Sequence, residues 1–98
     1  MKANAIMVDA KDNVATVVEP ISKGADIHYF VKGELVDLKA SEDIPANHKI
    51  ALAGIKTGEH VIKYGETIGA ATRDIPVGAW VSHENIVSLP RDYDSELK

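Results

Sequence analysis

A short turn signature recurs along this chain of 98 residues and constrains its fold more than any other feature. The pattern is Ile-x-x-(Gly or Asn)-x-x-(Ile or Val), and its copies begin at residues 21, 44, 55 and 75. Proline suits the second position of a type I turn and glycine the fourth, and two copies carry proline there, at Pro45 and Pro76. Each copy therefore predicts an apolar anchor, a tight turn and the start of a strand. The uneven spacing excludes a solenoid, which needs a fixed period.

The apolar composition points to strands. The chain contains ten valines and ten isoleucines but five leucines. Side chains branched at Cβ lose rotamer freedom in helices and pack well on pleated surfaces. Helical periodicity is poor, because windows with apolar residues at helical spacing are interrupted by glycine or proline. We therefore predict an all-β fold with short strands and at most two short helices.

Several segments are predicted as strands on the basis of apolar runs bounded by turn residues. Lys32-Gly33 lies between two of them and predicts a hairpin. The charged segment 91–98 is expected to fray as a tail, which leaves residues 1–90 as one domain. The predicted strands are Ala3–Val8, Val14–Glu19, Asp26–Val31, Glu34–Leu38, Lys49–Ala53, Glu59–Tyr64 and Ala79–Val81.

Charge and cysteine content exclude several classes of function. The chain has no cysteine, which removes disulfides, thiolate zinc sites and thiol nucleophiles. Its formal net charge of −4 argues against nucleic-acid binding, which needs clustered cations. No apolar stretch approaches the ~20 residues of a membrane-spanning helix, and the N-terminus does not resemble a secretory signal. We expect a soluble, cytoplasmic domain that binds neither nucleic acid nor membranes.

Three polar clusters carry the candidate chemistry. His48 and Lys49 follow the Pro45 turn, where a lysine charge and an imidazole donor could hold an anion. The other two clusters are Lys63-Tyr64 and the run from Ser82 to Asn85, which includes His83. Each is equally explained as an exposed turn or loop. The chain has no phosphate-binding glycine loop, no serine nucleophile motif and no paired histidines at metal-ligand spacing, so it displays no complete catalytic set.

Blocks of residues in a fixed order resemble a known family. They are Asp12-Asn13-Val14-Ala15, His48-Lys49-Ile50-Ala51-Leu52, residues 61–72 and residues 75–81. Together they resemble the SAF domain that stands at the N-terminus of altronate and galactarate dehydratases or is encoded separately as their small subunit. The resemblance covers residues 12–90 and implies a β-clip, in which long bent hairpins fold over on themselves.

The resemblance implies that this chain is part of a carbon–oxygen lyase. Such dehydratases convert a sugar acid to a 2-keto-3-deoxy acid with a divalent metal, typically iron, and a large subunit would hold that metal and most catalytic groups. The chain is then expected to be inactive alone. It would contribute His48 and Lys49 to catalysis, with Lys63, Tyr64, His83 and Asn85 as candidate substrate contacts.

The sequence departs from the family pattern at two places, and other functions stay open. Asn47 stands where many relatives have glycine, although asparagine tolerates the left-handed backbone of such a turn. Many altronate-type relatives end the last strand with His-x-His-Asn, whereas this chain has Ser82, Glu84 and Asn85 at the matching positions. The alternatives are the small subunit of a sulfolactate sulfo-lyase and a non-enzymatic SAF-type binding or assembly module. Whether the isolated chain forms a homo-oligomer is also open.

Overall fold

The fold is all-β, as predicted. A computed structural model describes residues 2–89, and within them it contains strands and turns but no helix. The strands are β1 (Ala5–Ile6), β2 (Val14–Val17), β3 (Asp26–Val31), β4 (Glu34–Lys39), β5 (Lys49–Ala51), β6 (His60–Lys63), β7 (Glu66–Ala71), β8 (Trp80–Val81) and β9 (Ile86–Ser88). The predicted tail lies outside the described residues. No helix in residues 2–89 is long and apolar enough to cross a membrane.

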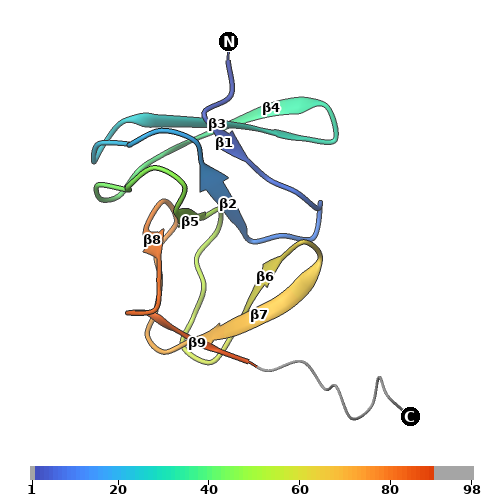
Figure 1. The fold of residues 1–98 in the computed structure, drawn as a ribbon, viewed down its shortest axis with the longest axis vertical. Helices are drawn as coiled ribbons and strands as arrows, with labels where there is room; N and C mark the ends of the chain where they lie inside the picture. The colour runs from blue at the N-terminus through green and yellow to red at the C-terminus, as the bar shows by residue number, and fades with distance from the viewer. Residues whose placement is uncertain (1, 90–98) are drawn as a thin grey trace.

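Three antiparallel sheets build the molecule. Strands β1, β2, β5 and β8 form a central sheet in the order β1-β2-β5-β8. The β3–β4 hairpin lies at one end of the molecule, and the sheet β6-β7-β9 lies at the other (Figure 1). Both hairpins turn through two residues with positive φ, Lys32-Gly33 and Tyr64-Gly65, as the right-handed twist of paired strands requires. The hairpin predicted at Lys32-Gly33 is therefore confirmed.

All four copies of the turn signature form the predicted turns. The residue at the glycine position is left-handed in each, with φ of 84° at Gly24, 69° at Asn47, 86° at Gly58 and 81° at Gly78. Asparagine thus takes the place of glycine in one turn, which its tolerance of this conformation permits. The anchoring isoleucines are nearly inaccessible to solvent in every copy.

The four turns belong to two similar units, each a hairpin with a turn on either side. We call residues 21–50 the first unit and residues 55–81 the second. Ile21 and Ile44 exchange two backbone hydrogen bonds of 2.9 and 2.8 Å, and Ile55 and Ile75 exchange two of 2.8 and 2.7 Å. The copies are unevenly spaced because those within a unit begin 23 or 20 residues apart, whereas the second unit begins only 11 residues after the last copy of the first. The repeat is thus one of paired turns around a hairpin.

Two asparagines hold the hairpins by the same set of bonds. Asn4 accepts from the backbone N–H of His28 through Oδ1 at 2.7 Å, and its Nδ2 donates to the carbonyl of Asp26 at 3.1 Å. Asn13 does the same to β6: its Oδ1 accepts from Ile62 at 2.7 Å and its Nδ2 donates to the carbonyl of His60 at 2.9 Å. In each case the asparagine amide pairs with the hairpin backbone as a neighbouring strand would. The hairpin is thereby bonded to the start of a central strand.

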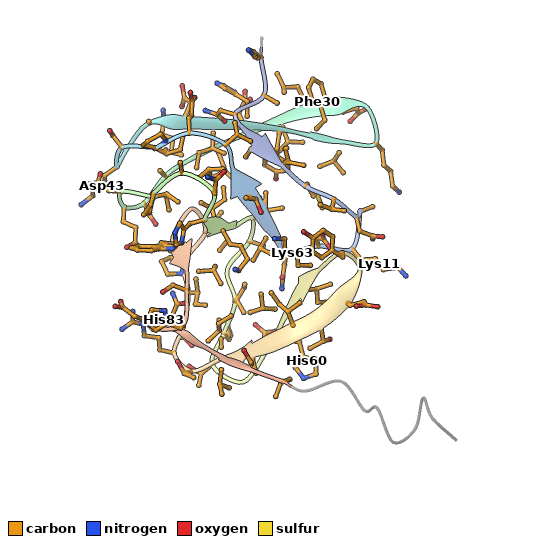
Figure 2. The ribbon with its side chains drawn as sticks, in the orientation of Figure 1. Lys11, Phe30, Asp43, His60, Lys63 and His83 are labelled. Atoms are coloured by element: carbon orange, nitrogen blue, oxygen red, sulfur yellow. The ribbon has the colours of Figure 1, made fainter. Side chains whose placement is uncertain are left out.

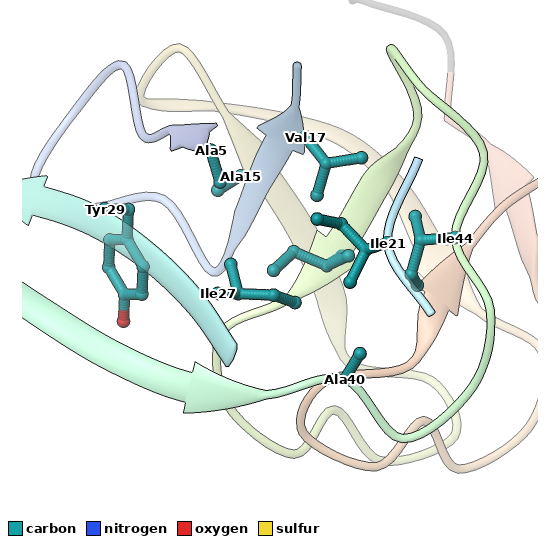
Figure 3. Close-up of a cluster of buried hydrophobic side chains, with 9 residues drawn as sticks. Ala5, Ala15, Val17, Ile21, Ile27, Tyr29, Ala40 and Ile44 are labelled. Carbon is teal, nitrogen blue, oxygen red and sulfur yellow. The ribbon is translucent and has the colours of Figure 1, made fainter. Parts of the chain in front are cut away.

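Each unit has a hydrophobic core of its own. The first core gathers around Ile21, Ile27, Ile44 and Ile50 (Figure 3). The second gathers around residues of the second unit with Val14 and Ala51 from the central sheet. Burial of β-branched side chains is the main stabilising contribution in both cores. The central sheet supplies residues to both, since alternate side chains of a strand point to opposite faces.

Two strands escaped the sequence-based prediction. β7 and β9 were not among the predicted strands. Gly69 is a strand residue that β9 crosses closely: a Cβ there would lie 2.6 Å from the carbonyl oxygen of Val87. Glycine permits that approach, but a sequence pattern does not distinguish a glycine of this kind from one that marks a turn. Most of the other strands are shorter than predicted, and Asp26–Val31 matches its prediction.

Candidate functional site

His48 pairs with a residue that the sequence did not connect to it. The indole Nε1 of Trp80 donates to Nδ1 of His48 at 3.2 Å. The two rings meet edge to face, with centroids 5.2 Å apart and planes at 89°. Pairing of β5 with β8, in which Ile50 lies opposite Trp80, brings the two residues together. The imidazole of His48 stays exposed, so it remains open to a ligand.

The backbone of Trp80 is held by side chains at both its N–H and its carbonyl. Its N–H donates to Oε2 of Glu42 at 3.1 Å, and its carbonyl accepts from Nδ2 of Asn85 at 2.7 Å. Oδ1 of Asn85 accepts from the backbone N–H of Ser82 at 2.9 Å. Both ends of the buried Asn85 amide are therefore paired with backbone. We conclude that Asn85 has a structural role in the turn that follows β8.

The structure brings Lys49, Lys63 and Tyr64 together. Burial lowers the pKa of the Lys49 ammonium, the positive charge of Lys63 lowers that pKa further, and Tyr64 raises it. Nζ of Lys63 lies 4.9 Å from the centre of the Tyr64 ring, a cation–π distance. Lys49 belongs to β5 and Lys63 to β6, so strands of different sheets contribute the two charges. We call Lys49, Lys63 and Tyr64 the lysine cluster.

A buried carboxylate positions one side of the lysine cluster. Asp12 accepts from the backbone N–H of Tyr64 through Oδ2 at 3.1 Å and from that of Gly65 through Oδ1 at 2.8 Å. Its Oδ2 also accepts from the N–H of Asp9 at 3.0 Å. These three backbone donors supply the hydrogen bonds that a buried carboxylate needs. Asp12 therefore anchors the β6–β7 turn, beside which Lys63 lies.

The remaining predicted contact lies elsewhere on the surface. His83 is exposed on the turn after β8 and is well separated from Lys63 in the view of Figure 2. The structure thus groups Lys49 with Lys63 and Tyr64, and it places His48, the residue before Lys49, against Trp80. None of the predicted site residues lines the hollow of about 480 Å³ beside Ile55 and Ile75.

The described residues do not form a metal site. Residues 2–89 contain no cluster of three or more His, Cys, Asp or Glu side chains that could hold an ion. A divalent cation needs several such ligands at close range. The donor set of this part of the chain therefore does not fit an iron centre by itself. The predicted site residues that the structure brings together are instead two lysines and a tyrosine.

Trp80 is the site residue that the sequence analysis missed. It is the only tryptophan of the chain, and it directly precedes the end of the last predicted strand. That position was a signal of a special role. Its link to His48 could not be found from sequence, because it depends on which strand pairs with β5.

Comparison with known proteins identifies relatives of this chain. The profile of the altronate/galactarate dehydratase SAF domain matches residues 3–89. The galactarate dehydratase (L-threo-forming) of Escherichia coli strain K12 is 40% identical over 85 residues, which are 87% of this chain and 15% of that protein. The altronate dehydratase of Bacillus subtilis strain 168 is 35% identical over 80 residues, which are 82% of this chain and 15% of that protein.

A third relative is a separate subunit rather than part of a long dehydratase chain. The (2R)-sulfolactate sulfo-lyase subunit alpha of Paracoccus pantotrophus is 48% identical over 48 residues, which are 49% of this chain and 72% of that subunit. The chain thus spans about 15% of the length of the two dehydratases but resembles most of one separate lyase subunit.

Proposed function

The chain belongs to the altronate/galactarate dehydratase SAF family, and we propose that it acts as the small subunit of a sugar-acid hydro-lyase. In this role it binds the carboxylate end of the substrate, while a large dehydratase subunit supplies the metal and most catalytic groups. The relatives support a larger partner, because this chain matches a small part of each dehydratase.

The lysine cluster is the observation that carries this proposal. Lys49 is half-buried, and burial and the positive charge of Lys63 both lower its pKa, so the charged form is penalised twice. An anion between the two ammonium groups would relieve the repulsion and replace lost solvation. A sugar-acid carboxylate has the required charge.

The reaction gives the cluster a defined task. Removing water from a sugar acid requires loss of the proton α to the carboxylate, and negative charge then develops on the carboxylate as an enolate forms. Fixed positive charges and hydrogen-bond donors aimed at that position stabilise the transition state. In our proposal Lys49 and Lys63 hold the carboxylate, and His48 donates to an oxygen of the same substrate. The divalent metal, which would act as a Lewis acid, stays with the partner.

A second candidate, the small subunit of a sulfolactate sulfo-lyase, is favoured by one observation. The relative of that name is a separate subunit alpha, most of which this chain resembles. Sulfolactate also carries a carboxylate, so the lysine cluster would serve the same purpose. A panel of altronate, galactarate and sulfolactate assayed with one complex distinguishes the two candidates.

The test requires the complex. The chain is co-expressed with a candidate large dehydratase-like protein, and the purified complex is assayed with the substrate panel. We expect Lys49→Ala and Lys63→Ala each to raise KM about tenfold, since a hydrogen bond to a charged group contributes about 1.5–3 kcal/mol. The exposed Lys23 gives a matched control, and Lys23→Ala should leave KM unchanged.

Three results would contradict the proposal. Unchanged KM in both cluster variants would remove the carboxylate-binding role. Turnover by the isolated, metal-supplemented chain would overturn the small-subunit role. Failure to form any complex with the large protein would favour the non-enzymatic binding module.

A further inference from the structure

We infer that Trp80 is a positioning residue that fixes the tautomer of the neutral His48 imidazole, with Nδ1 as acceptor and the proton on Nε2, so that His48 meets a ligand as a hydrogen-bond donor. The inference rests on the proposed function for its consequence in catalysis. The hydrogen bond between Trp80 and His48 and the tautomer of His48 concern this chain alone, and both can be tested without a partner.

The hydrogen bond between the two rings fixes the direction of donation. An indole nitrogen carries a proton and has no lone pair to offer, so it can only donate. The 3.2 Å contact therefore uses the lone pair of His48 Nδ1 as acceptor. In a neutral imidazole, the nitrogen that does not accept carries the proton. That leaves an N–H at Nε2, on an imidazole that is still exposed.

Contacts around Trp80 and His48 hold both rings in place. Glu42 accepts from its backbone N–H and Asn85 donates to its carbonyl, as described above. The perpendicular ring contact also restricts rotation of the His48 imidazole. The backbone of His48 is held as well, because its carbonyl accepts from the N–H of Val17 at 3.0 Å. Donor and acceptor are thus fixed before a substrate arrives, which lowers the cost of ordering them on binding.

This arrangement narrows the role of His48. A free imidazole can act as donor or acceptor at either nitrogen. With Nδ1 occupied by Trp80, His48 offers its Nε2 proton to a hydroxyl or carboxylate oxygen. It therefore serves as an electrostatic stabiliser beside Lys49, and the base that removes the α proton must come from another residue.

Nitrogen NMR of the full chain labelled with ¹⁵N tests the hydrogen bond and the tautomer. Spectra are recorded about two pH units above the usual histidine pKa of about 6.5, where the imidazole is neutral. We expect a protonated Nε2 and an unprotonated Nδ1 for His48, with a coupling across the hydrogen bond to Trp80 Nε1. Trp80→Phe keeps an aromatic ring but removes the donor, so the coupling should vanish and the two tautomers should mix. A proton on Nδ1 of His48 in the unaltered chain would overturn the inference.

A double-mutant cycle in the complex tests the consequence for catalysis. We expect Trp80→Phe to lower kcat/KM about fivefold, which is the net contribution of about one hydrogen bond, and to have no effect when His48 is already alanine. A similar loss in both backgrounds would overturn the positioning role, because Trp80 would then act independently of His48. Full activity of the His48→Ala complex would overturn the proposed role of His48, whereas the NMR spectra would still decide the tautomer.

Discussion

The two units of the molecule have the same turns but differ in what the last turn presents. In the first unit the turn ends at Asn47 and is followed by His48 and Lys49, whereas in the second it ends at Gly78 and is followed by Ala79 and Trp80. The backbone bonds match: the N–H of Asn47 donates to the carbonyl of Val17, and that of Gly78 donates to the carbonyl of Ala51, each at 2.8 Å.

Packing explains the difference. The Gly78 turn lies beneath the end of the first hairpin, where its carbonyl accepts from the N–H of Ser41, and a Cβ at Gly78 would lie 2.2 Å from the carbonyl oxygen of Lys39. The equivalent Asn47 is exposed. The turn of the second unit is therefore committed to holding the units together, and the turn of the first is free to carry polar groups. Structurally equivalent positions thus serve stability in one unit and, in the proposed function, substrate binding in the other.

Truncating an isoleucine anchor should destabilise either unit by a similar amount. Ile44 and Ile75 occupy equivalent bridges and are 1% and 2% exposed. We expect Ile44→Ala and Ile75→Ala each to lower the free energy of unfolding by about 4 kcal/mol, since each leaves a cavity in a packed core. Urea denaturation measures both, with the milder Ile→Val changes as a fallback. A cost below about 1 kcal/mol at either position would refute the equivalence of the units.

A reciprocal exchange sharpens the comparison between the two turns. Gly78→Asn should cost about 3 kcal/mol, because the new Cβ must displace the backbone of Lys39. Asparagine tolerates the left-handed conformation, so the loss reports mainly the clash. Asn47→Gly should change stability by no more than about 0.5 kcal/mol, since the position is exposed and left-handed. Equal costs in thermal unfolding would show that neither turn is specially packed.

The smallest effect concerns the charge at Lys49, which is equivalent to Trp80 in the second unit. Because its pKa is lowered from the ordinary value of 10.5, the folded chain binds fewer protons than the unfolded chain over the window between the two values. The stability contributed by Lys49 therefore rises as the pH increases towards 10.5. Lys49→Met should be more stable than the original chain at neutral pH, and this advantage should shrink with increasing pH.

Urea denaturation at several pH values checks this prediction. Lys23→Met, in an exposed turn, provides the control and should follow the original chain at every pH. A constant difference between Lys49→Met and the original chain across the alkaline range would contradict the lowered pKa.

Local features of the fold were predictable because they are encoded in neighbouring residues. Proline and glycine or asparagine after an isoleucine determine the turns, and alternation in Asp26–Val31 marks a strand. β7 was not predictable, because the role of Gly69 depends on the close passage of β9, which the sequence does not show. The duplication was hidden for a similar reason: only the pairing of Ile21 with Ile44 and of Ile55 with Ile75 shows which turns belong to one unit.

The site was predictable in part. His48, Lys49, Lys63 and Tyr64 were singled out from short polar runs, and the structure brings the last three together. The roles of Asp12 and Trp80 were not apparent, since both act through contacts between segments distant in the chain. Asn85 looked like a candidate contact because it is polar, but burial and backbone pairing use both ends of its amide.

The most direct test of the central claim, that the first unit lends groups to a partner's active site, is kcat/KM of the reconstituted complex with two histidine variants. His48→Ala should fold, assemble with the large subunit and lose activity about 10²-fold, as expected when a donor used in the transition state is removed. His28 lies on the first hairpin, where its Nδ1 contacts Oδ1 of Asp37 at 2.6 Å, and His28→Ala should retain assembly and activity. Equal activity of the two complexes would show that His48 is a structural histidine and would contradict the account.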